Sequence, residues 1–104
     1  MTVMMIRARV REDTVNQVEQ AAQTMFAAIA ERQPTGVRYS SSRLPDGQTY
    51  VALLELDDPR HNPLAEIPEF AAFQESLKGW LAGPPAAEAL EPIGSYRMFE
   101  ATNP

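Results

Sequence analysis

The sequence predicts an α+β domain in which strands and helices follow the order β-α-β-β-α-β. Three observations support this order. The chain begins with alternating apolar residues, two longer stretches repeat apolar residues at three- and four-residue spacing, and a strong turn signal separates two strand-like runs in the middle. This order is the split plan of the ferredoxin-like fold, in which a four-stranded antiparallel sheet carries both helices on one face.

The central hairpin is predicted by the residues that join its two arms, 36–44 and 49–56. Pro45 presets φ at the second position of a turn, Asp46 can accept a bond from its own backbone, and Gly47 tolerates a positive φ. Runs of strand-favouring residues on both sides make this a hairpin with a type I turn followed by a glycine bulge.

The other elements follow from periodicity. Residues 3–10 alternate in a period of two and predict the first strand, and residues 13–32 carry one apolar stripe and predict a long helix. Pro68 suits the first position of a second helix over 68–82, which Gly83 ends. Alternation over 93–100 predicts the last strand, while 86–91 is either a plain connection or one helical turn.

The second arm of the hairpin, Thr49 to Leu56, is apolar on both of its faces. Helices on one side of a sheet cover only one of these faces. A second copy of the chain is the simplest cover for the other, so we expect a homodimer formed through the sheet face.

Composition excludes several classes of function. A chain of 104 residues is expected to form one domain over 1–104, and its net charge of −5 argues against nucleic acid as a partner. With no cysteine and one histidine, the chain offers no thiolate or two-histidine metal site. There is no dinucleotide fingerprint, P-loop, signal-peptide core or membrane-spanning stretch. We therefore expect a cytoplasmic protein that is not bound to a membrane.

Two segments carry a resemblance to a known family: PEFAAFQESLKGWLAGPP (68–85) and the closing PIGSYRMFE (92–100). With the layout of the whole chain, they resemble the antibiotic-biosynthesis-monooxygenase-like members of the dimeric α/β-barrel superfamily. This resemblance implies a small oxygenase of phenolic or quinol substrates that needs no cofactor, although many members have no known activity. Haem-degrading relatives pair a first-strand asparagine with a tryptophan and a later histidine. This chain has Trp80 without the other two, which argues against haem degradation.

Four residues are candidates for a small-molecule site. His61 is the only side chain that titrates near neutrality and is the candidate general base; its alternative is a solvated or bracing loop residue. Tyr39 offers a hydroxyl group. Phe73 and Trp80 offer an apolar wall, although core packing is the simpler account of their place on the helical stripe. The loop from Asp57 to Glu66 is expected to form the mouth of this pocket.

The charged residues of the predicted strands also have two possible roles. Arg7, Arg9, Arg97 and Glu55 are expected on the sheet face away from the helices, as a polar network at the dimer interface or as an anion clamp.

The sequence therefore supports two hypotheses about function. One is a cofactor-independent monooxygenase of a small aromatic or quinol substrate. The other is a homodimer, with a stress-associated or binding role, that holds a small apolar or aromatic ligand without turning it over.

Overall fold

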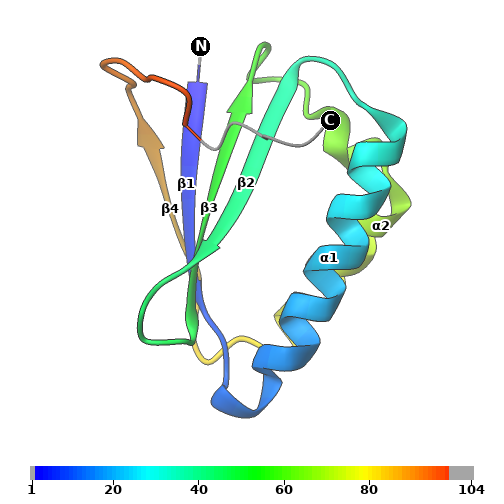
Figure 1. The fold of residues 1–104 in the computed structure, drawn as a ribbon, viewed down its shortest axis with the longest axis vertical. Coiled ribbons are helices and arrows are strands. Elements are labelled where there is room, and N and C mark those ends of the chain that lie inside the picture. Colours follow the sequence, from blue (N-terminus) through cyan, green and yellow to red (C-terminus); the bar gives the residue numbers. More distant parts are fainter. Residues whose placement is uncertain (1, 99–104) are drawn as a thin grey trace.

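The computed structural model describes residues 2–98 and shows an antiparallel sheet with two helices on one face (Figure 1). The sheet order is β2-β3-β1-β4, which confirms the predicted ferredoxin-like α+β plan. Within the described residues, no helix is both long and apolar enough to cross a membrane. The strands are β1 (Thr2–Arg9), β2 (Val37–Arg43), β3 (Thr49–Leu56) and β4 (Ala86–Leu90), the helices are α1 (Val15–Arg32) and α2 (Pro68–Lys78), and short 3-10 turns lie at Glu12–Thr14 and Pro63–Glu66.

The hairpin between β2 and β3 forms where the sequence predicts it. The Gly47 N–H donates to the Leu44 carbonyl at 3.0 Å, and Gly47 has a φ of 77°. The Asp46 carboxylate accepts bonds from the backbone of Gln48 and Thr49 and, at 2.6 Å, from the Thr49 hydroxyl. Asp46 thus fixes the loop and, with it, the register of the hairpin.

Helix α2 is shorter than the predicted 68–82 and ends at Lys78. The segment after Gly79 is drawn into contact with the end of β1. The Arg11 N–H donates to the Trp80 carbonyl at 2.9 Å, and Leu81 forms a bridge with Val10. These backbone bonds replace those of a further helical turn. The helix therefore ends before the apolar stripe of the sequence does.

The predicted last strand is wrong. The fourth strand is Ala86–Leu90, in the stretch that the sequence left as a connection, and residues 93–98 are irregular. The last two residues of the predicted strand, 99 and 100, lie outside the described part of the chain. The strand starts early because residues 81 and 82 already lie beside the end of β1, whose free edge then pairs from Arg7↔Ala86 to Val3↔Leu90.

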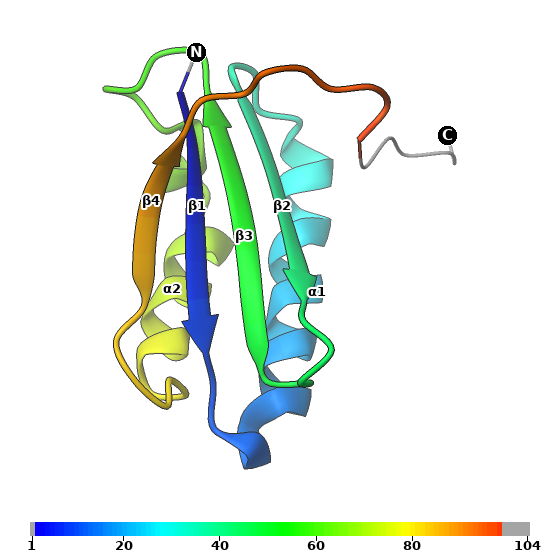
Figure 2. The same cartoon turned by 90° about the vertical axis from the view of Figure 1, so that its left-hand side faces the viewer.

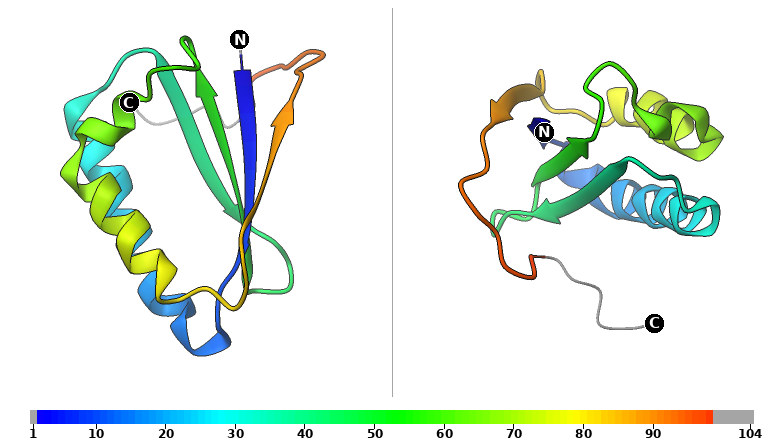
Figure 3. Two further views of the ribbon diagram at one scale, coloured as in Figure 1. Left: turned by 180° about the vertical axis from the view of Figure 1, so that it is seen from behind. Right: turned by 90° about the horizontal axis from the view of Figure 1, so that it is seen from above.

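The two faces of the sheet differ. The face towards the helices carries the core, whose buried apolar residues include Val10, Val18 and Met25. The opposite face, seen in Figure 2, has no helix over it. The views in Figure 3 place the segment after β4 on this open side.

The predicted charged network on the open face is not formed as expected. Glu55 pairs with Arg38, which also reaches Asp57 at 2.6 Å. Arg7 and Arg9 are exposed at the other end of β1. Arg97 lies in the irregular segment after β4 rather than on a strand, because the strand ends at Leu90.

Met25 is a sensitive point of the core, since it lies on α1 and only 1% of it is exposed. We expect Met25→Ala to lower the free energy of unfolding by about 2–5 kcal/mol, because a buried side chain is removed and a cavity remains. Gln20→Ala on the exposed side of the same helix is the control, with a change within about 0.5 kcal/mol. Equal stability of the two variants in urea unfolding would contradict this packing.

The turn carboxylate makes stability depend on pH. The Thr49 hydroxyl and the backbone N–H groups of Gln48 and Thr49 lower the pKa of Asp46 from 3.8 to about 2. Because the folded pKa lies below the unfolded one, the stabilisation is complete above about pH 4 and disappears as the pH falls towards 2.

We therefore expect Asp46→Asn to lower the melting temperature at pH 6, with a gap to the wild type that closes between about pH 4 and pH 2. Thermal unfolding followed by circular dichroism measures this gap. A gap of constant size over that range would show that the carboxylate charge plays no part.

Candidate functional site

A cavity of about 420 Å³ lies between the helices and the sheet. Strands β1, β2 and β3 form its floor, and α1 and α2 form its roof. Most of its lining is apolar, as in typical small-molecule sites, with a few polar groups gathered on one side. The lining residues are Ile6, Ala8, Val10, Val18, Glu19, Ala22, Gln23, Phe26, Tyr39, Ser41, Ser42, Arg43, Tyr50, Ala52, Leu54, Phe70, Phe73, Gln74 and Leu77.

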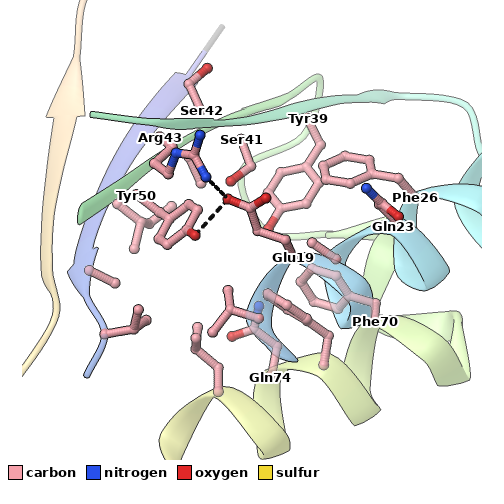
Figure 4. A pocket seen from close by; sticks show the side chains of 18 of the residues that line it. Glu19, Gln23, Phe26, Tyr39, Ser41, Ser42, Arg43, Tyr50, Phe70 and Gln74 are labelled. Carbon is pink, nitrogen blue, oxygen red and sulfur yellow. Dashed lines mark hydrogen bonds and ion pairs between the residues drawn. The ribbon is translucent and has the colours of Figure 1, made fainter. Parts of the chain in front are cut away.

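Aromatic side chains make one end of the cavity. Tyr39 of β2 stacks on Phe26 of α1, with ring centroids 5.4 Å apart. Tyr39 also makes a T-shaped contact with Phe70 of α2, with ring centroids 5.9 Å apart. The three rings come from three different elements and join sheet and helices at this end (Figure 4). Burial raises the pKa of the Tyr39 hydroxyl above 10.0, so this group stays protonated at neutral pH.

A charged corner faces the aromatic end. Glu19 of α1 points towards the sheet, where its Oε2 atom accepts a bond from the Tyr50 hydroxyl at 2.8 Å and from Arg43 Nη1 at 2.6 Å (Figure 4). Burial and the bond to Glu19 raise the pKa of Tyr50, so Tyr50 acts as a donor here. The side chains of Arg43 and Glu19 are 49% and 39% exposed, so the corner borders both cavity and solvent.

The exposed members of the lining show where the cavity reaches solvent. Ser41, Ser42 and Arg43 lie on β2, an edge strand, Gln23 lies on α1 and Gln74 lies on α2. A ligand therefore has a route between the free edge of β2 and α1, past the charged corner.

Two of the four residues proposed from sequence lie at this cavity and two do not. Tyr39 and Phe73 line it. His61 lines a separate hollow with Arg32 and Pro34, and its Nε2 atom lies 3.8 Å from Glu66 Oε2.

Trp80 is half-buried beyond the end of α2 and is not part of the cavity lining, because the chain turns at Gly79 towards β1. The loop from Asp57 to Glu66 contributes no lining residue either. The Asn62 side chain of that loop accepts a bond from the Leu64 N–H at 3.0 Å and caps the short turn at Pro63–Glu66.

Glu19 and Arg43 were missed by the reasoning from sequence. Glu19 follows Val18 directly and so lies at the border between the apolar stripe and the polar face of its helix. Such border positions can face a cavity when the opposite layer supplies partners, here Arg43 and Tyr50. A charge next to the stripe is the only local signal, and it is weak.

The described residues contain no group of three or more histidine, cysteine or carboxylate side chains that could hold a metal ion. The polar groups that line the cavity are one carboxylate, one guanidinium, two phenols, two serine hydroxyls and two amides, set against apolar walls.

Among known proteins, the chain matches solved structures but not family models or curated sequences. One of the solved structures is described as an antibiotic biosynthesis monooxygenase, with 9% identity and a TM-score of 0.75, covering 90% of this chain and 100% of its own.

Two further matches have known sources. Rv0793 from Mycobacterium tuberculosis has 19% identity and a TM-score of 0.70, covering 90% of this chain and 96% of its own. SnoaB from Streptomyces nogalater, described as a cofactor-independent oxygenase, has 20% identity and a TM-score of 0.66, covering 90% and 94%. At these identities the likeness is one of fold, and over about 90% of its length the chain has the fold of the antibiotic biosynthesis monooxygenases.

Proposed function

We propose that this chain is a monooxygenase that oxidises a small phenolic or quinol substrate in the cavity between helices and sheet, without a bound cofactor. The cavity itself carries this proposal: it has an aromatic end, apolar walls and one charged corner. The chain is also similar in fold to a protein described as a cofactor-independent oxygenase, which supports the same reaction class.

In this reaction the substrate supplies the electrons. An electron-rich phenol loses its hydroxyl proton to the protein and transfers one electron to O₂. The phenoxyl radical and superoxide then combine into a peroxide anion, which takes the proton back and becomes a hydroperoxide. Loss of water then gives a quinone, so that a naphthol and O₂ become a naphthoquinone and H₂O. The protein has to hold the ring in an apolar site and accept the proton.

Glu19 is our candidate for the group that accepts this proton. Its carboxylate lies at the cavity wall, and its Oε2 atom already accepts two bonds. Within residues 2–98, no partner is seen for its Oε1 atom, which is therefore open to a substrate hydroxyl. The earlier assignment of the base to His61 stays a prediction, but it requires a substrate in a different hollow.

The test is oxidation of a panel of naphthols and naphthohydroquinones, followed by O₂ consumption and by the absorbance of the quinone. We expect Glu19→Gln to lower kcat by about 10²- to 10⁴-fold, because an amide cannot accept the proton. His61→Ala is the matched control and should keep the wild-type rate. The opposite result, with His61→Ala inactive and Glu19→Gln active, would return the base to His61.

Binding of these compounds to the wild-type protein without any turnover would instead favour the binding-only homodimer. Absence of both binding and oxidation would remove the aromatic-ligand proposal altogether.

A homodimer through the open sheet face is the second part of the proposal. Val3, Met5, Val51 and Leu53 are half-buried and apolar on the face that no helix covers. Ile93, Tyr96 and Met98 after β4 are also exposed, at 104%, 82% and 61%. A second copy would bury both sets, and burial of apolar surface favours association.

We expect sedimentation equilibrium at micromolar concentration to show a dimer for the wild type. Leu53→Asp should shift it to monomer, because an unpaired carboxylate in the middle of the interface loses its water. Ala72→Glu, which adds the same charge on the exposed side of α2, should leave the dimer intact. A wild-type protein that stays a folded monomer would rule out this assembly.

A further inference from the structure

The charged corner of the cavity has hydrogen-bonding capacity that the chain does not use. Arg43 donates from Nη1 to Glu19 and also interacts with the Tyr50 hydroxyl, and among the described residues no carboxylate or carbonyl partner is seen for its Nε and Nη2 atoms. The Ser41 hydroxyl, on the same strand, also lines the cavity and has no described partner. The corner thus offers an unused guanidinium edge and a hydroxyl next to one unused carboxylate oxygen.

These free groups define what a ligand must present. The Nε and Nη2 edge of an arginine is planar and fits the two oxygens of a carboxylate. The free Glu19 oxygen needs a donor, which a phenol hydroxyl supplies. Since Arg43 and Glu19 touch each other, the two ligand groups must lie on the same ring. They cannot be directly adjacent, because an adjacent carboxylate would itself accept the bond from the hydroxyl group and leave no donor for Glu19.

The charge of the corner limits where a ligand carboxylate can lie. The Arg43 and Glu19 charges balance, so a ligand carboxylate that enters alone would lack a full counter-charge. Arg43 can serve both carboxylates because its side chain is 49% exposed and solvent reaches its outer edge. A ligand carboxylate would accordingly lie at the rim, and its aromatic rings would extend inwards towards Tyr39 and Phe26.

We infer that the cavity selects aromatic compounds that carry a hydroxyl group and a carboxylate at meta positions of one ring, and that Arg43 is the residue that determines this specificity. The inference rests on the proposed function, because it concerns the ligand of the same cavity. The competing explanation is that Arg43 only ties β2 to α1 by holding Glu19, in which case no preference for an acid follows.

Isothermal titration calorimetry with a matched pair of probes separates these explanations. The probes are 4-hydroxy-2-naphthoic acid and 1-naphthol, which share rings and hydroxyl and differ in the carboxylate. We expect the wild type to bind the acid about 10- to 100-fold more tightly, as for hydrogen bonds to a charged group. In Arg43→Gln that preference should fall to about threefold or less, while the affinity for 1-naphthol changes little.

The control is Arg38→Gln, which removes an ion-paired arginine from the same strand outside the cavity lining and should keep the preference. Arg43→Lys keeps the charge but not the planar fork, so its preference should be intermediate; it carries the test if Arg43→Gln does not fold.

Each other outcome is informative. Equal binding of both probes by the wild type would overturn the inference and leave the proposed function standing. Equal weakening of both probes in Arg43→Gln would show that Arg43 acts only through Glu19. Failure of either probe to bind the wild type, together with no oxidation of the phenol panel, would count against the proposed function itself.

Discussion

The register between β1 and β3 is the constraint on which the rest of this structure depends. Ile6 pairs with Ala52 and Ala8 with Tyr50, so the floor of the cavity comes from two strands at once. Because side chains alternate across a strand, a slip of β3 by one residue would bring Val51 to the floor and remove Tyr50 from the charged corner. One end of this register is held by Val10 and Gln48: the Val10 N–H donates to the Gln48 carbonyl and the Gln48 side chain donates to the Val10 carbonyl, each at 3.0 Å.

A cavity forms here because small and large side chains are unevenly distributed. Alanines stand at the middle of its floor and roof, at positions 8, 22 and 52. Phe26, Tyr39 and Phe70 meet at one end, where three elements contact each other through their rings. Alanine leaves space that its neighbours can fill only by shifting backbone, and the aromatic contacts resist that shift. An unfilled cavity lowers the stability of the fold relative to a filled core, and such a cost is typical of functional sites.

The charged corner links this space to the proposed chemistry. A carboxylate facing an apolar cavity requires hydrogen-bond donors, and Glu19 receives them from Tyr50 and Arg43 on neighbouring strands. These bonds also hold α1 against the sheet at the edge strand β2. The same contacts therefore shape the entrance of the cavity and place polar groups at it. The apolar face on the other side of the sheet is a separate feature, which carries the proposed homodimer and does not line the cavity.

Local sequence determined the parts of this protein whose periodicity has one solution. The long stripe on α1, the turn at Pro45 to Gly47 and the two-sided strand β3 each specify their structure from neighbouring residues, and their order is enough for the fold class. Tyr39 and Phe73 could also be placed at a pocket, since each is a large aromatic on a face turned towards the other layer.

Only the tertiary structure decided the last strand and the charged corner. Ala86–Leu90 has little intrinsic preference for a strand, and it forms one because the preceding residues already lie beside the free edge of β1. Residues 93–98 have the alternating pattern but no such neighbour within the described chain. Glu19 likewise joins the cavity because Arg43 and Tyr50, more than 20 residues away, lie opposite it. Pairing partners distant in sequence, and not the local pattern, determine both outcomes.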